Sequence, residues 1–286
     1  MKGPEIMSDT EKDWRTDWAE NLKRLGCLIA VLCFAAVVAG FLVPLHHSPR
    51  EESRADTEKV RAEKFLQKGN TCLEAKKYES AARYFSLAAE LGNAEAQYEL
   101  GDCFVLGTGV EQDFAEAVKW YRKAAEQGNP QAQLNLGWCY YDGGGVEKDL
   151  AEALKWIRKS ADNGLADAQF AMGCVYAEGA GIQEDKTEAA QWFLKAAEQG
   201  HLQAQFLLGD FFRRGDGVKQ DWTMAAKWYL LAAKQGHPEA QHNLGCCYEN
   251  GNGVEKDLKE AESWFRKSAE QGVEQAKAAL KRIGAE

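Results

Sequence analysis

The feature that most constrains this chain is an internal repeat of 36 residues, which runs from Asn93 to Gly272 without an insertion or a deletion. Alanine, glutamine, glycine, aspartate and tryptophan recur at fixed places in all five units. Self-similarity at such a period is typical of a solenoid, because each unit is one supersecondary element that cannot bury its apolar face alone. The units cover residues 93–128, 129–164, 165–200, 201–236 and 237–272.

The pattern within a unit predicts two helices joined by a loop that contains glycine. In the first unit, Ala96, Leu100 and Phe104 are apolar and follow one another at four-residue spacing, which indicates a first helix with one buried stripe. Gly107 and Gly109 then permit a turn with positive φ. A single buried stripe leaves the opposite side of this helix for another role.

The second helix of a unit is expected to begin after an aspartate and to end at a glycine. Asp113 is placed to cap the helix, Glu116 completes a capping box, and Gly128 stands where a left-handed C-terminal residue is expected. Only the fourth unit lacks the glutamate, since Met224 is the residue three positions after Asp221 there. We expect one tryptophan per unit to supply the bulk of the core between the helices: Trp120, Trp156, Trp192, Trp228 and Trp264.

These motifs resemble the Sel1-like repeat family, a relative of the tetratricopeptide repeats. The resemblance rests on A-Q-x-x-(L/M)-G-x-x-(Y/F), G-x-G-(V/I)-x-x-D and A-x-x-W-x-x-x-(A/S)-A-x-x-G in every unit. Residues 61–92 look like a first, tetratricopeptide-like repeat without the four-residue loop extension, and residues 273–286 look like a C-terminal capping half-repeat. The resemblance implies an all-α fold, a right-handed α-α superhelix (solenoid) whose concave face holds other proteins.

A second feature lies before the repeats. Residues 25–45 are 21 residues without a charge, and at about 1.5 Å per helical residue such a segment spans roughly the 30 Å hydrocarbon core of a bilayer. We therefore predict one transmembrane helix, preceded by a short polar segment (1–24) and followed by a charged linker (46–60). A cleaved signal peptide is the alternative, because small residues at 37–40 offer a cleavage site.

Charges beside the apolar segment favour one orientation. Lys23 and Arg24 directly precede it, whereas Arg50 is separated from it by four residues after Leu45. Because positive residues are retained on the cytoplasmic side, we expect a cytoplasmic N-terminus and an extracytoplasmic repeat domain. The chain would then be a single-pass membrane protein.

Composition and motifs argue against several functions. The net charge is −9, which disfavours a nucleic-acid partner because phosphate binding needs clustered positive charge. The glycine-rich loops lack the Gly-Lys-Ser/Thr ending of a phosphate-binding loop, and no His-Glu-x-x-His zinc motif is present. We therefore expect no cofactor, no metal and no small-molecule substrate.

Catalysis has one specific alternative. Some cysteine-rich relatives in the Sel1-like family are linked to β-lactam hydrolysis, so an exported β-lactam or cell-wall hydrolase is the second hypothesis. The sequence has no Ser-x-x-Lys, which would place nucleophile and base one helical turn apart. A non-enzymatic scaffold for a protein or peptide partner is the preferred interpretation.

Six cysteines fall in the expected first helices, and none falls in a second helix. Equivalent positions on neighbouring helices are about 8 to 10 Å apart, which exceeds the ~7 Å limit between Cα atoms for a disulfide. Free and mostly buried thiols are expected; for the adjacent pair Cys246–Cys247, core packing is the preferred role and a redox or metal pair is the alternative. The six are Cys72, Cys103, Cys139, Cys174, Cys246 and Cys247.

Candidate partner-binding residues are those that break the repeat on the first helices, since the repeating residues hold the scaffold. Trp138 and Tyr141 are out of pattern in the second unit, and Arg213 and Arg214 form an isolated basic pair in the fourth. Aromatic residues and arginine dominate the energetics of protein interfaces. The alternative for Trp138 and Tyr141 is that they cover the stems of neighbouring helices.

Overall fold

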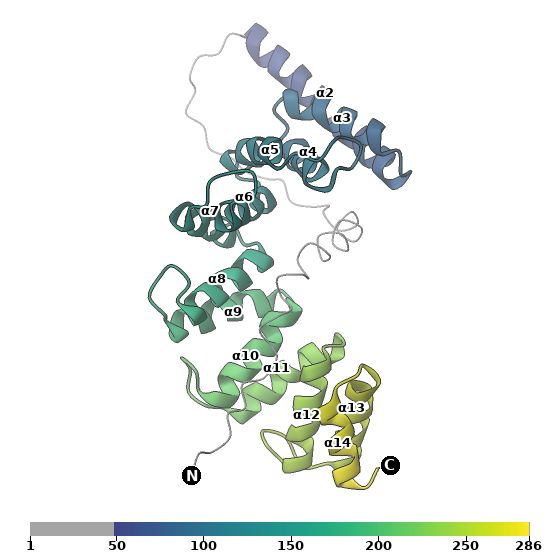
Figure 1. Cartoon of the computed structure of the whole chain (residues 1–286), viewed down its shortest axis with the longest axis vertical. Helices are drawn as coiled ribbons and strands as arrows, with labels where there is room; N and C mark the ends of the chain where they lie inside the picture. Colours follow the sequence, from purple (N-terminus) through teal and green to yellow (C-terminus); the bar gives the residue numbers. More distant parts are fainter. Residues whose placement is uncertain (1–48, 286) are drawn as a thin grey trace. The chain divides into compact units, whose positions relative to one another are not determined.

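The structure, a computed structural model, describes residues 49–285, and every regular element in that part of the chain is a helix (Figure 1). Six helical hairpins follow one another and a last single helix ends the row, so the all-α repeat solenoid is confirmed. The helices are α2 (Pro49–Glu74), α3 (Tyr78–Glu90), α4 (Ala94–Leu106), α5 (Phe114–Glu126), α6 (Pro130–Asp142), α7 (Leu150–Asp162), α8 (Ala166–Glu178), α9 (Lys186–Glu198), α10 (Leu202–Arg214), α11 (Trp222–Lys234), α12 (Pro238–Asn250), α13 (Leu258–Glu270) and α14 (Glu274–Ile283).

The part of the chain before the repeats is only partly described. None of the helices in residues 49–285 combines the length and the apolar character that a membrane span requires. The apolar segment 25–45 lies outside the described residues, so the transmembrane helix stays a prediction. Residues 49–60, which the sequence analysis assigns to the linker, are helical and continue directly into the rest of α2.

Loops of seven residues connect the two helices of each later unit, and they also join one unit to the one before it. Gly217 has φ 64°, and a Cβ atom on it would lie 2.1 Å from the carbonyl oxygen of Lys186, at the beginning of the preceding unit's second helix. Gly181 has a similar φ of 78°, yet its Cβ would meet only a Leu154 methyl group at 3.3 Å. A side chain is therefore excluded at Gly217 by both conformation and space.

The aspartate caps form as expected, but without the second half of a capping box. Asp113 Oδ1 accepts the backbone N–H groups of Ala115 and Glu116 at 2.9 and 3.0 Å. The N–H of Asp113 donates to the carbonyl of Phe104 at 3.0 Å, so the Glu116 side chain pairs with a lysine instead. The same backbone bond occurs in every unit, which explains why Asp221 caps its helix without a following glutamate.

The core divides its large side chains between two positions. Within a unit, the residue after the tryptophan fills the space between the helices: the Tyr121 ring packs directly on Gly101, leaving no room for a Cβ there. The tryptophans pack between consecutive units instead. Trp192 of α9 is 5% exposed and belongs to a buried cluster with Met172 of α8 and with Ile157 of α7, which is in the preceding unit. The expectation that tryptophan is the main core residue thus applies to the junctions.

A ladder of glutamine side chains links the junctions. Gln205 is buried, its Nε2 donates to the carbonyl of Ala197 at 3.1 Å, and its Oε1 accepts from Nε2 of Gln235 at 2.8 Å. This buried amide has a hydrogen-bond partner at both its nitrogen and its oxygen, and its bond to Ala197 links two successive units. The glutamine of the A-Q motif is therefore a structural residue.

All six described cysteines are free thiols. Cys247 is buried in the core beside Leu244, whereas Cys246 Sγ lies 3.5 Å from Nε2 of His242. The two adjacent cysteines therefore have different surroundings, one in the core and one beside a histidine. Among residues 49–285, no three His, Cys, Asp or Glu side chains are grouped so that they could hold a metal ion.

Candidate protein-binding surface

Trp138 and Tyr141 lie together on α6. Their rings make an edge-to-face contact with centroids 5.6 Å apart and planes at 86°. Both residues are half-buried, because Trp138 packs against the cluster that includes Met172 of α8, and the Lys148 ammonium lies 5.4 Å from the Tyr141 ring centroid. The pair therefore partly covers the next unit, as the alternative interpretation expects, and still presents aromatic surface to solvent.

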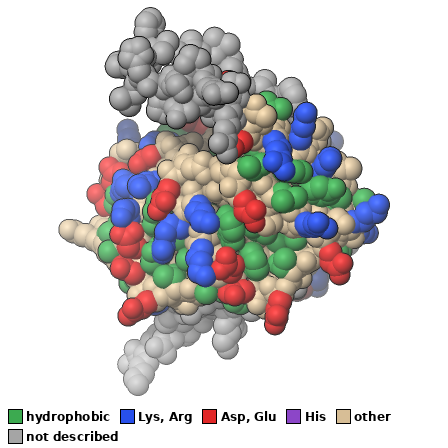
Figure 2. All heavy atoms as spheres, turned by 90° about the horizontal axis from the view of Figure 1, so that it is seen from above, with side chains coloured by type: hydrophobic (Ala, Val, Ile, Leu, Met, Phe, Trp, Pro, Cys, Tyr) green, Lys and Arg blue, Asp and Glu red, His purple; other side chains and the backbone are tan. Residues whose placement is uncertain are grey.

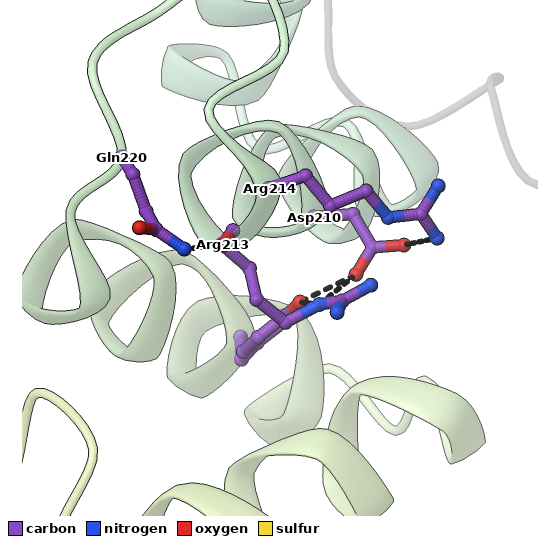
Figure 3. Close-up of polar contacts among 5 residues, drawn as sticks. Asp210, Arg213, Arg214 and Gln220 are labelled. Atoms are coloured by element: carbon purple, nitrogen blue, oxygen red, sulfur yellow. Dashed lines mark hydrogen bonds and ion pairs between the residues drawn. The ribbon is translucent and has the colours of Figure 1, made fainter.

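Arg213 and Arg214, the last residues of α10, both bind Asp210 (Figure 3). Arg213 Nε donates to Asp210 Oδ1 at 3.0 Å and to the Tyr229 hydroxyl at 3.1 Å, while Arg214 Nη2 donates to Asp210 Oδ2 at 3.2 Å. The Tyr229 hydroxyl in turn donates to Asp210 Oδ1 at 2.5 Å. One carboxylate thus orients both guanidinium groups, and about half of the Arg214 side chain is exposed.

The two candidate pairs do not meet in one site. Trp138 and Tyr141 are on α6 and the arginines are on α10, so a complete repeat, α8 and α9, separates them along the solenoid. Each pair is built within one first helix. A partner that contacts both pairs has to extend along several units.

A third cluster, which the sequence analysis does not select, lies on α4. We call it the α4 acidic cluster: Glu95, Tyr98, Glu99 and Asp102, which share one helix face, with Tyr121 of α5 and Asn135 of α6. The Tyr121 hydroxyl donates to Asp102 Oδ1, and Asn135 Nδ2 donates to the same oxygen at 3.3 Å. The spacing i, i+4, i+7 of the three acids would have revealed their common face.

The carboxyl groups of the α4 acidic cluster are perturbed. Burial, followed by repulsion from Asp102 and Glu95, raises the pKa of Glu99 to about 8. Burial also raises the pKa of Asp102 to about 6, against the opposing effect of the hydrogen bonds that it accepts from Tyr121 and Tyr98. Within residues 49–285, no Lys or Arg side chain pairs with these acids. The cluster is therefore an uncompensated concentration of acidic groups.

Charge elsewhere is mixed. On the face in Figure 2, Lys and Arg side chains, Asp and Glu side chains and hydrophobic side chains are interspersed, and no single sign of charge dominates. This face therefore has no general field of one sign.

Comparison with protein-family models matches the Sel1 repeat six times, over residues 62–93, 94–129, 130–165, 166–201, 202–237 and 238–273. The shorter first unit is thus included in the match. This chain belongs to the Sel1 repeat family.

Solved structures support the same conclusion. A protective antigen present in uropathogenic Escherichia coli strains, described as displaying an SLR fold, is 38% identical with a TM-score of 0.75. The match covers 83% of this chain and 52% of that protein, so this chain spans about half of its length. A Sel1 repeat protein from Oxalobacter formigenes is also 38% identical, with a TM-score of 0.67 over 77% of this chain and 87% of that one. Comparison with curated proteins gives no match.

Proposed function

We propose that this chain is a non-enzymatic scaffold that binds a protein or peptide partner through the exposed side of its first helices. The observation that carries the proposal is the division of labour between positions. The repeated residues have structural roles: they cap helices, make glycine contacts, fill the core or form the glutamine ladder. The candidate residues vary between units and are partly exposed; they are Trp138, Tyr141, Arg213 and Arg214. Repeat proteins of this architecture bind through such variable positions.

The proposal includes a membrane anchor. Residues 25–45 would hold the chain in the bilayer, with the N-terminus in the cytoplasm and the repeats outside it. A reporter that is active only outside the cytoplasm, fused after Glu286, is expected to be active. Activity of a cytoplasm-only reporter at the same position would reverse the orientation.

Site-specific photo-crosslinking in intact membranes tests partner binding. A photoreactive amino acid in place of Tyr141 should yield a discrete crosslinked protein, and the Trp138→Ala substitution should reduce it. The matched control places the same group at Lys119, which is exposed on the second helix α5. Equal crosslinking from both positions would refute a binding surface on the first helices, and turnover of a chromogenic β-lactam by the purified chain would refute the non-enzymatic role.

A further inference from the structure

Two units contain the same pair of hydrogen-bonded side chains. Asp102 and Asp210 are the tenth residues of the units that begin at 93 and 201, and Tyr121 and Tyr229 are the twenty-ninth. In both units the tyrosine hydroxyl donates to the aspartate Oδ1. The repeat therefore supplies its own comparison of one structural element in two settings.

In the unit that begins at 201, the element binds guanidinium groups. Arg213 donates to both the aspartate and the tyrosine, at 3.0 and 3.1 Å, and Arg214 donates to the other carboxylate oxygen at 3.2 Å. The acidic oxygens are thereby neutralised from within the same helix (Figure 3). An aspartate and a tyrosine in this arrangement are thus shown to accept an arginine side chain.

In the unit that begins at 93, the equivalent positions hold Val105 and Leu106. Asp102 keeps its hydrogen bonds from tyrosine and asparagine but has no basic partner in residues 49–285, and Glu99 adds a second carboxyl group one helical turn away. Burial is the main cause of the raised pKa values of Glu99 and Asp102, and repulsion from neighbouring carboxyl groups adds to it. A cation bound beside these acids would favour their charged forms.

The backbones of the two elements correspond. The Gln112 amide donates to the carbonyl of Val105 at 2.7 Å, as the Gln220 amide donates to the carbonyl of Arg213 at 2.8 Å. Both first helices then end at a glycine in the left-handed conformation. The difference beside the aspartate therefore lies in the side chains: where Arg213 binds Asp210, the unit that begins at 93 has Val105, which packs against the cluster that contains Tyr121 and offers no charge to Asp102.

We propose that the α4 acidic cluster binds an arginine side chain of the partner, presented by a basic peptide segment, in the place that Arg213 occupies within its own unit. The proposal rests on the proposed function and specifies the chemistry of one part of that surface. Arginine fits because its planar fork donates to two acceptors at once, as Arg213 does to Asp210 and Tyr229. Glu99 supplies a second carboxyl group one helical turn away, and a guanidinium group beside it would favour its ionised form.

Selection of peptides tests this assignment. The full chain, purified in a nonionic detergent, is used to select binders from a random linear peptide library displayed on phage, and the binders are then synthesised for fluorescence polarisation. We expect enrichment of arginine at one position, and at least a tenfold loss of affinity when citrulline, its neutral isostere, replaces that arginine.

Two variants locate the site. Val105→Arg supplies an internal guanidinium beside Asp102, so it should fold normally, occupy the cluster and reduce peptide affinity at least tenfold. Ala177→Arg is the matched control: it places the same side chain at the equivalent position of the unit that begins at 165, whose tenth residue is Cys174 instead of an aspartate, and it should leave affinity unchanged.

Each other result overturns the assignment. Selected peptides without a basic residue, or arginine peptides that bind Val105→Arg as well as they bind the original chain, would refute the α4 acidic cluster while leaving the scaffold role intact. Saturation of the cluster by Mg²⁺ or Ca²⁺ in competition with the peptide would assign it to a divalent cation. Competition by a synthetic peptide of residues 9–24 would assign it to this chain's own N-terminal segment. Failure to select any peptide would refute the assignment as well, and crosslinking from position 141 would then decide the scaffold role separately.

Discussion

The loop glycines provide a test of how units are joined, because two of them differ in only one respect. Gly217 and Gly181 have the same place in adjacent units and similar positive φ values of 64° and 78°. A Cβ atom on Gly217 would lie 2.1 Å from the carbonyl oxygen and 2.2 Å from the carbonyl carbon of Lys186. A Cβ atom on Gly181 would meet a flexible Leu154 methyl group at 3.3 Å. Substitution by alanine therefore separates conformational strain from steric exclusion.

The expected magnitudes follow from these distances. An alanine held in the left-handed region costs about 1 to 2 kcal/mol, which is the whole loss expected for Gly181→Ala. Gly217→Ala adds the displacement of a packed backbone, which as overpacking costs about 1 to 3 kcal/mol more, so its total is about 2 to 5 kcal/mol. The added loss should fall on the junction between α9 and α10, since units of a solenoid interact with their nearest neighbours.

Urea unfolding followed by far-ultraviolet circular dichroism and by tryptophan fluorescence measures both variants. Gly217→Ala should have the lower midpoint, and its two signals should separate as the junction opens before the rest. Equal losses in the two variants would show that close backbone contact between a loop and the preceding unit does not stabilise the solenoid, and the argument from Gly217 would fail.

Three further outcomes are expected. Trp192→Ala should cost about 3 to 5 kcal/mol, because a large side chain is removed from a junction, and an unchanged thermal melt would exclude that role. Glu99 has a folded-state pKa of about 8, above its ordinary value of 4.5, so its contribution to stability is present below pH 4.5 and is lost as the pH rises through 8. At pH 8, Glu99→Gln should therefore be more stable than the original chain by about 1 kcal/mol or more, and its urea midpoint should be higher. At pH 4 the two chains should be equally stable. A stability difference that stays constant between pH 4 and pH 8 would contradict the raised pKa. Trp138→Ala combined with Arg214→Ala should weaken partner capture by about 2 kcal/mol or more with little change in helical content, whereas lost stability with retained capture would assign Trp138 to packing.

The sequence alone determined the repeat architecture, because its evidence is periodic. Ten residue positions recur in five units at one spacing, and some of the recurring residues have local tasks that do not depend on distant contacts, such as the cap at Asp113. Periodicity also identified the positions that escape these tasks, which led to Trp138 and Arg213. A local argument nevertheless overstated the capping box, since the backbone N–H of Asp113 was already bound to a carbonyl across the loop.

The tertiary structure decided what depends on distances between units. It assigned the tryptophans to junctions and the residues after them to unit interiors. Adjacent residues on one helix point in different directions, and only the packing of the neighbouring helices decides which direction meets the same unit and which meets the preceding one. It also showed that Arg213 and Arg214 share one carboxylate with Tyr229, whereas Asp102 meets Tyr121 without a basic partner in the described chain. Charge compensation is a property of neighbours in space, and Tyr121 is 19 residues from Asp102 along the chain. For that physical reason the spacing of the acids on α4 could indicate their common face, but only the folded molecule showed which neighbours Asp102 has.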